Sequence, residues 1–271
     1  MTDRGSVHRP ARRLTVAGGE ILDEIVAEEV AVALVYNGIS HAVMMATPAD
    51  LEDFARGFTL TERIVEKPSE IFDIEVEEGE RGIEVKLEIA APRMQSLQER
   101  RRSLAGRTGC GLCGVDSLEA AMRPVAVSAS GSRVARAAIE RAMTALPARQ
   151  RINKLNGATH AAGWANAEGN LIAVREDVGR HNALDKLAGA LALMERNVPG
   201  SVASGGFVVV TSRCSYEMVQ KAAAIGAAAI SAVSAPTSLA IETAERANIA
   251  LAAFVREGRL TAYAHAERIL P

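Results

Sequence analysis

The chain has 271 residues and a formal net charge of -2, with 31 basic and 33 acidic residues spread along its length. No overall field therefore favours nucleic acid or an anionic membrane as a partner. Apolar residues make up 48% of the chain and aromatic residues only 3%, so Ala, Val, Leu and Ile must fill the interior. Three cysteines are too few for a disulfide framework, and we expect a reduced, cytoplasmic protein.

The N-terminal segment is basic, and the apolar run of a signal peptide does not follow it. We expect residues 1–18 to form a flexible basic arm. The most apolar later stretch, residues 222–233, is interrupted by a glycine and a serine and followed by Pro236. It falls far short of the roughly 20 apolar residues that cross a bilayer, so we expect no membrane association.

Residues 19–150 predict a small α+β unit. The stretch 24–45 is rich in Val and Ile and contains Asn37-Gly38, a strong signal for a two-residue hairpin turn. A helix should follow, because apolar residues recur at helical spacing from position 51, with Thr47 as a candidate cap.

Later in this unit, residues 71–78 and 82–90 alternate apolar and charged side chains. Such alternation predicts a half-exposed antiparallel hairpin. The periodic signal then weakens up to about residue 149, apart from a helix expected over 132–146.

The pattern changes after residue 150. Four short apolar runs occur, and the first three lead through polar loops into Ala-rich helical segments; the runs are 170–176, 205–212, 227–234 and 249–255. Buried strands that alternate with helices favour crossover connections and a mainly parallel sheet. We therefore predict that residues 151–271 form a three-layer α/β/α domain, in which ligands gather at the carboxyl ends of the strands.

Basic and hydroxyl side chains follow these predicted strands. The three loops at predicted helix starts carry Arg180 and His181 with Asn182 as a candidate cap, then Thr211, Ser212, Arg213 and Ser215, and then Ser234, Thr237 and Ser238 around Pro236. The last strand leads into a basic turn with Arg256, Gly258 and Arg259. Each group alone is equally typical of helix capping or a solvated turn. Three such loops in succession favour a ligand with several phosphates. Neither G-x-x-x-x-G-K-[ST] nor G-x-G-x-x-G occurs, so ATP hydrolysis and a Rossmann dinucleotide site are not supported.

A cysteine pair lies in the glycine-rich loop GRTGCGLCGVDS, residues 106–117, as Cys110 and Cys113. Just upstream, residues 93–107 contain five arginines against one glutamate, and such charge lowers the pKa of a thiol. The sequence offers no second C-x-x-C pair and no H-x3-5-H pair to complete a zinc site. The glycines disfavour a thioredoxin-like helix start. Two interpretations of the cysteine pair remain. It is either a persulfide carrier on an exposed loop or a structural turn whose thiols have no chemical role. The third cysteine, Cys214, is expected to be a buried filler.

Several blocks of the sequence resemble a known family. They are GCGLCG, VREDVGRHNALDK, SYEMVQKAA, VSAPTSLA, FVREGR and the earlier NGISHAVMMATPADLEDFARGFTLTERIV. Together they are similar to the formate dehydrogenase accessory sulfurtransferases, the FdhD/NarQ family, over about residues 20–265.

This resemblance implies a cytoplasmic sulfur carrier. The family takes sulfur from a cysteine desulfurase and delivers it to the bis-molybdopterin guanine dinucleotide form of the molybdenum cofactor, which then enters formate dehydrogenase. By motif, Cys110 corresponds to the persulfide intermediate and Cys113 assists. A homodimer is expected, with no resident metal.

The resemblance also implies a cofactor-binding stretch, which is Phe254, Val255, Arg256, Glu257, Gly258 and Arg259. Arg180, His181 and Arg213 are further candidates for contacts with phosphates or bases. The C-terminal fold should resemble that of cytidine deaminases, but the deaminase H-x-E pattern is missing at His160, so we expect no deaminase chemistry. Two alternatives stay open, a cofactor-binding chaperone without sulfur transfer and a dithiol oxidoreductase.

Overall fold

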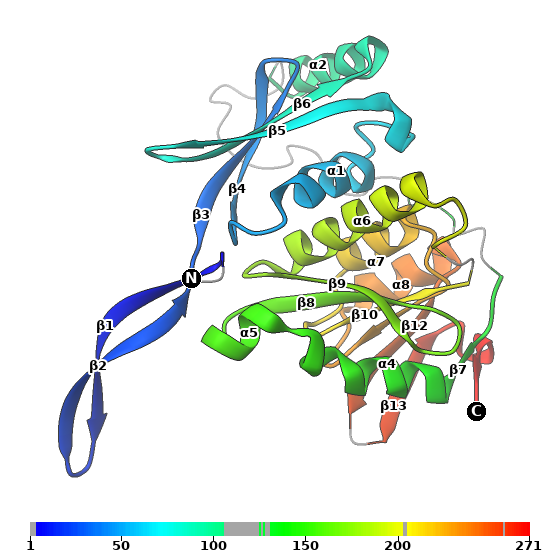
Figure 1. The fold of residues 1–271 in the computed structure, drawn as a ribbon. Coiled ribbons are helices and arrows are strands. Elements are labelled where there is room, and N and C mark those ends of the chain that lie inside the picture. The colour runs from blue at the N-terminus through cyan, green and yellow to red at the C-terminus, as the bar shows by residue number, and fades with distance from the viewer. Residues whose placement is uncertain (1–3, 106–124, 126, 128–130, 203–204, 257) are drawn as a thin grey trace.

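The computed structural model describes residues 4–105, 125, 127, 131–202, 205–256 and 258–271, with the side chains of residues 100–105 left out. Within these residues the fold is mixed α/β. Its strands form a six-stranded sheet, a four-stranded sheet and two small two-stranded sheets (Figure 1). The cysteine loop at 106–117 lies outside the described residues.

The N-terminal segment is a β-hairpin. Strand β1, Ser6–Thr15, pairs with β2, Gly18–Ala27, in antiparallel register from Ser6 opposite Ala27 to Thr15 opposite Gly18. Residues 6–15 were predicted to belong to a flexible arm and instead lie in a strand, because each of them has a cross-strand partner in β2. In Figure 1 this hairpin projects away from the rest of the molecule.

The four-stranded sheet consists of two hairpins, in the order β4-β3-β6-β5. Its strands are β3 (Val30–Tyr36), β4 (Ile39–Ala46), β5 (Ile71–Gly79) and β6 (Gly82–Ile89). The predicted turn at Asn37-Gly38 is confirmed, since both residues have positive φ, 46° and 79°. The second predicted hairpin is confirmed by the antiparallel pairing of β5 with β6.

Helix α1, Leu51–Thr61, covers one face of this sheet with Phe54 and Phe58 in a shared apolar core. It begins after Asp50 and not at Thr47, the cap that we predicted. The short helix η1 (Pro68–Glu70) precedes β5, and α2 (Ala91–Ala105) follows β6.

The six-stranded sheet has the order β13-β12-β11-β10-β8-β9. Its strands are β8 (His160–Ala165), β9 (Leu171–Asp177), β10 (Phe207–Val210), β11 (Ala229–Ala232), β12 (Ala250–Arg256) and β13 (Arg259–Ala264). Only β10 with β11 and β11 with β12 pair in parallel. The prediction of a mainly parallel sheet is therefore wrong, because β8 and β13 each fold back beside a neighbour as antiparallel strands.

Helices cover both faces of this sheet, as in a three-layer arrangement (Figure 1). On one side lie α6 (Arg180–Asn197), α7 (Tyr216–Ala224) and α8 (Ser238–Ala247); α4 (Arg136–Arg149) and α5 (Arg151–Asn156) lie on the other. Helix α4 precedes residue 150, yet Ile139 and Leu146 share a core with Val209 of β10. This helix therefore packs with the C-terminal sheet.

The chain ends against the same layer. The helix η2 (Ala266–Arg268) leads into β14 (Ile269–Leu270), which pairs with β7 (Val134–Ala135) just before α4. None of the helices in the described part of the chain combines the length and the apolarity that a membrane span requires.

Helices α1 and α6 join the two larger sheets by direct backbone contact. A Cβ atom added to Gly57 would overlap the carbonyl oxygen of Asp185, and one added to Gly189 would overlap that of Asp53. The two helices thus touch where each lacks a side chain. This contact fixes the N-terminal sheet and its helix on the outer side of α6.

Gly57→Ala should reduce the free energy of unfolding by about 1–3 kcal/mol, because an added methyl group must push the two backbones apart. Urea denaturation measures the loss. Gly131→Ala is the matched control, since no described residue lies within 4 Å of the added atom there. Equal stability of the two variants would contradict the close contact.

Candidate functional site

The loops that sequence analysis selected meet at one edge of the six-stranded sheet. Strands β10, β11 and β12 run in parallel, and β9 has the same direction because it is antiparallel to β8, which is antiparallel to β10. The carboxyl ends of four strands and the amino end of β8 therefore lie along this edge. We call it the strand-end edge.

Three of these loops are hydrogen-bonded to one another. The backbone N–H of Cys214, after β10, donates to the carbonyl of Ala235, after β11, at 3.1 Å, and Thr237 N–H donates to the Cys214 carbonyl at 3.0 Å. Phe254 N–H, in β12, donates to the Ser234 carbonyl at 3.4 Å. The loops after β10 and β11 and the end of β12 thus form one continuous surface.

The side chain of Cys214 does not contribute a reactive group to that surface. Its side chain is fully buried, and burial raises the pKa of its thiol to about 12. A buried neutral thiol is a poor nucleophile. The prediction of a buried filler is confirmed.

Helix α6 places two of the predicted residues, Arg180 and His181, at the strand-end edge as its first two residues. The Nε2 atom of His181 lies 2.8 Å from a carboxylate oxygen of Glu217 and 3.4 Å from the Ser215 hydroxyl, both at the start of α7. Burial is the main cause that lowers the pKa of His181; Glu217 opposes it and the charge of Arg180 adds to it. The ring is therefore neutral near pH 7.

Arg180 supplies an unused donor at this edge. Its Nε atom is buried and has no hydrogen-bond partner among the described residues. Burial, and then the charge of Arg180, lower the pKa of His160 at the start of β8, so the guanidinium acts on both histidines. Arg213 lies exposed in the loop after β10. A half-buried guanidinium whose buried Nε has no partner among the described residues, at a helix start, suits an anion.

The predicted stretch at the end of β12 divides between the surface and the core. Phe254 has a positive φ of 53° and keeps 36% of its surface exposed, at an irregularity in the pairing of β12 with β13. Such a backbone costs about 1–3 kcal/mol in a non-glycine residue. Val255, by contrast, is buried in the core beneath the sheet. Arg256, Gly258 and Arg259 form the turn into β13, whereas Glu257 lies outside the described residues.

Asp177, the last residue of β9, holds the turn that leads into Arg180 at the start of α6. Its carboxylate accepts hydrogen bonds from Gly179 N–H at 2.7 Å, Asn182 Nδ2 at 3.1 Å and Thr47 N–H at 3.0 Å. It also forms an ion pair with Lys186 Nζ at 2.7 Å, and both side chains are fully buried. Asn182 therefore donates a side-chain hydrogen bond to Asp177 and is not the helix cap that we predicted.

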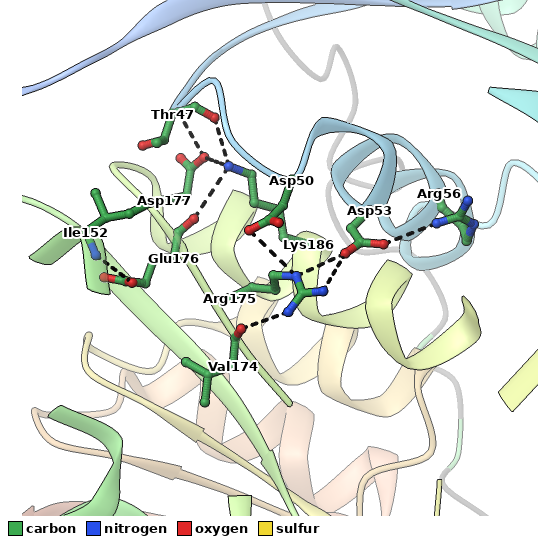
Figure 2. Close-up of polar contacts among 10 residues, drawn as sticks. All are labelled: Thr47, Asp50, Asp53, Arg56, Ile152, Val174, Arg175, Glu176, Asp177 and Lys186. Atoms are coloured by element: carbon green, nitrogen blue, oxygen red, sulfur yellow. Dashed lines mark hydrogen bonds and ion pairs between the residues drawn. The ribbon is translucent and has the colours of Figure 1, made fainter. Parts of the chain in front are cut away.

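Thr47 completes this arrangement from the N-terminal unit. Its carbonyl accepts from Lys186 Nζ at 2.8 Å, and its hydroxyl accepts from Val178 N–H at 3.1 Å. Arg175 reaches back to Asp53 of α1 at 2.7 Å (Figure 2). The end of β4 and the start of α1 are thereby tied to the loop at the strand-end edge.

A second buried cluster lies one helical turn below His181. Lys221 of α7 pairs with Asp185 of α6 at 2.9 Å and with Glu62 after α1 at 2.9 Å. Burial acts to lower the pKa of Lys221, but the two carboxylates outweigh it and raise that pKa. Positions 181 and 185 of α6 thus face positions 217 and 221 of α7 in register.

The sequence analysis predicted neither the cluster around Asp177 and Lys186 nor the cluster around Lys221 and Asp185. The available signal was the spacing of Asn182, Asp185 and Lys186, which lie on a helix among Ala and Leu residues. Polar residues on an otherwise apolar helix indicate buried partners.

These features define a mixed α/β protein with an anion-suited edge at the ends of four strands, connected rigidly to a smaller α+β unit. The model of the FdhD/NarQ family matches residues 27–270. The chain belongs to the FdhD/NarQ family.

Curated relatives agree with this assignment. The sulfur carrier protein FdhD of Cupriavidus necator is 58% identical over 254 residues, which is 93% of this chain and 86% of the relative. The sulfur carrier protein FdhD of Bordetella petrii is 51% identical over 94% of this chain and 90% of its own length.

A solved structure shows the same fold. The crystal structure of a candidate formate dehydrogenase accessory protein from Desulfotalea psychrophila matches with a TM-score of 0.73 and 25% identity. The match covers 98% of this chain and 99% of that one.

His181 should titrate with a midpoint below 6.5, the ordinary histidine value, in an NMR titration of the ring. Because the unfolded chain then binds this proton more readily than the folded one, acidification below about pH 6.5 should also lower the free energy of unfolding. Glu217→Gln should lower the midpoint further, since an opposing charge is lost. Arg180→Ala should raise it. Shifts in the opposite directions would refute this electrostatic picture of the edge.

Proposed function

We propose that this chain carries sulfur as a persulfide on Cys110, from a cysteine desulfurase to the bis-molybdopterin guanine dinucleotide form of the molybdenum cofactor, for formate dehydrogenase. Family membership and the names of the curated relatives support the sulfur-carrier class. The unpartnered, buried Nε of Arg180 at the strand-end edge is the observation that supports an anionic cargo. We further propose a cytoplasmic homodimer.

The proposed sulfur transfer is an exchange without net oxidation. The thiolate of Cys110 attacks the outer sulfur of the desulfurase persulfide and forms a new S–S bond. The old S–S bond breaks, and the desulfurase cysteine leaves as a thiolate. The outer sulfur keeps its proton, so charge and atoms balance. Cys113 is proposed to assist release.

We place the guanine dinucleotide tails of the cargo at the strand-end edge. Phosphate oxygens suit the guanidinium of Arg180 and the side chains of Arg213, Arg256 and Arg259, whose planar donors match them. The exposed ring of Phe254 offers a face for a base, and stacking of a base on an aromatic ring contributes about 1–3 kcal/mol. The neutral ring of His181, fixed by Glu217, can exchange a hydrogen bond with a base edge.

The resemblance of the C-terminal unit to cytidine deaminases stays a prediction. We propose that the shared part, if compared directly, is the mixed sheet with helices on both faces. The deaminase chemistry is not proposed, because His160-Ala161-Ala162 replaces the H-x-E pattern and the sequence has no P-C-x-x-C pattern.

Incubation with a cysteine desulfurase and cysteine should add about 32 Da, the mass of one sulfur, to the Cys110 peptide. Cys110→Ala should abolish the label. Cys214→Ala is the matched control and should leave it unchanged, because that thiol is buried and its pKa is raised to about 12. Mass spectrometry of the digested protein provides the measurement, and an unlabelled wild-type Cys110 would defeat the proposal.

The strand-end edge would also serve a chaperone that only protects and hands over the cofactor. Activation of formate dehydrogenase separates the two functions. A chaperone retains activation in the Cys110→Ala variant, whereas a sulfur donor loses it. A dithiol oxidoreductase would instead reveal itself by insulin reduction with a dithiol donor.

Guanosine diphosphate should bind the wild-type protein in isothermal titration calorimetry. Arg180→Ala and Phe254→Ala should each weaken binding about tenfold, equivalent to about 1.4 kcal/mol. Arg246→Ala, on the exposed last turn of α8, is the control and should bind normally. Equal affinity of all four proteins would remove the nucleotide from this edge.

A further inference from the structure

The hairpin of β1 and β2, residues 6–27, is called the arm. It carries large apolar side chains in the open: Leu14 is 73% exposed, Ile21 84%, and Val16 at its tip is fully exposed. Near its base the arm contacts α5, and from there it projects away from the body (Figure 1). The cross-strand register places Ile21 opposite Arg12 on one face, and Val26, which is 38% exposed, opposite Val7 on the other. Both faces therefore expose apolar groups.

An isolated two-stranded hairpin is only marginally stable in water. Exposed apolar side chains on both of its faces gain nothing from burial until another surface covers them. The arm is ordered over ten cross-strand pairs. These facts indicate that the arm has a covering surface in solution.

The charges of the arm specify the chemistry of that surface. Arg13 forms ion pairs with Glu20 and Glu24 of the arm itself, at 3.1 and 3.0 Å. Arg9 and Arg12 form no ion pair with any residue in the described part of the chain. The arm thus presents apolar groups together with two arginines that no carboxylate in the described part of the chain pairs with. A complementary surface has an apolar floor and an acidic margin.

The protein itself has such a surface beside the base of the arm. A groove of about 680 Å³ lies there, and we call it the acidic groove. Its apolar lining is Val30, Ala31, Met45, Pro48 and Ile83, and its charged lining is Glu28, Glu29, Glu78 and Glu80 with Arg4 and Arg81. Carboxylates outnumber arginines, and Arg4 is already paired with Glu78 at 3.4 Å.

The groove continues onto the sheet face opposite α1. On this outer face, Val43 is 63% exposed and Met45 52% exposed. Across β3, the pairing of β5 with β6 places acidic side chains on the same face, namely Asp73, Glu75, Glu77, Glu84 and Glu88, with Lys86 as the one basic residue of these pairs. The acidic and apolar character of the groove therefore extends over a wider surface.

The tip of the arm cannot reach the groove of its own chain. A ten-residue strand spans about 33 Å, and the groove lies at the base of the arm. A second copy brings both surfaces together, because a two-fold axis pairs each arm with the groove of the other chain. In such a dimer the two chains exchange arms, and each arm is buried in the groove of the other chain by the same contact.

We infer that the arm packs into the acidic groove and onto the outer sheet face of a second copy of this chain, so that two copies exchange arms. This inference rests on the homodimer in the proposed function and names its interface. Leu14, Val16 and Ile21 supply the buried apolar contacts. Arg12, on the face of Leu14 and Ile21, and Arg9, on the opposite face, meet carboxylates of the partner's groove on either side of the arm.

Sedimentation velocity on the full chain tests the apolar part. The wild-type protein should be a dimer, and the double variant Leu14→Asp with Ile21→Asp should raise the dissociation constant at least about tenfold. Val198→Asp is the matched control, because Val198 is 61% exposed and lies after α6, remote in sequence from the arm. A monomeric wild type, or an unchanged dimer in the double variant, would overturn the inference.

Charge exchange tests the pairing of the arm with the groove. An arm variant, Arg9→Glu with Arg12→Glu, and a groove variant, Glu29→Lys with Glu80→Lys, should each be monomeric alone, because like charges would then meet. Mixed together, they should form a heterodimer, because both arm and groove contacts regain opposite charges. Circular dichroism confirms that each variant is folded. Failure of the mixture to associate would exclude this interface.

Sulfur loading distinguishes this inference from the proposed function. If Cys110 takes no sulfur while the charge-exchanged mixture associates, the sulfur-carrier proposal fails and the interface stands. If Cys110 is loaded while the arm variants remain dimeric, the interface fails and the carrier proposal stands.

Discussion

The buried ion pair of Asp177 and Lys186 is the constraint on which the strand-end edge depends. Both side chains are fully buried, and removal of one partner from such a pair typically costs about 3–5 kcal/mol. The remaining lone pairs of Asp177 bind the N–H of Gly179 and the amide of Asn182. The backbone that leads into Arg180 and His181 is therefore fixed before any ligand arrives, which reduces the ordering cost of binding.

The same pair determines how the two units meet. Thr47 contributes its N–H to Asp177 and its carbonyl to Lys186, and the glycine contact of α1 with α6 excludes side chains from the crossing. In sequence, the cysteine loop connects α2 of the N-terminal unit with α4 beneath the C-terminal sheet. A fixed relation between these units fixes the two described ends, α2 and α4, between which the cysteine pair lies in sequence.

Local signals explain what the sequence predicted correctly. Turn chemistry at Asn37-Gly38 and alternation along β5 and β6 act between neighbours, and both hairpins formed as expected. Strand β8, His160–Ala165, was missed because its Ala and Gly residues lack β-branched side chains. The clusters around Asp177 and Lys221 were missed for another reason. Their partners, Thr47 and Glu62, are more than a hundred residues away, and one sequence without relatives shows no such pairing.

The contacts of Thr47 have an implication for how this fold tolerates change. Of the three hydrogen bonds that join Thr47 to the C-terminal unit, two use its main-chain atoms and the third requires only its hydroxyl. Recognition through main-chain atoms is insensitive to the identity of the surrounding side chains. The Thr47 contacts thus require Asp177 and Lys186 on the other side of the junction but only a hydroxyl at position 47, so hybrid molecules whose C-terminal half keeps that pair would preserve them.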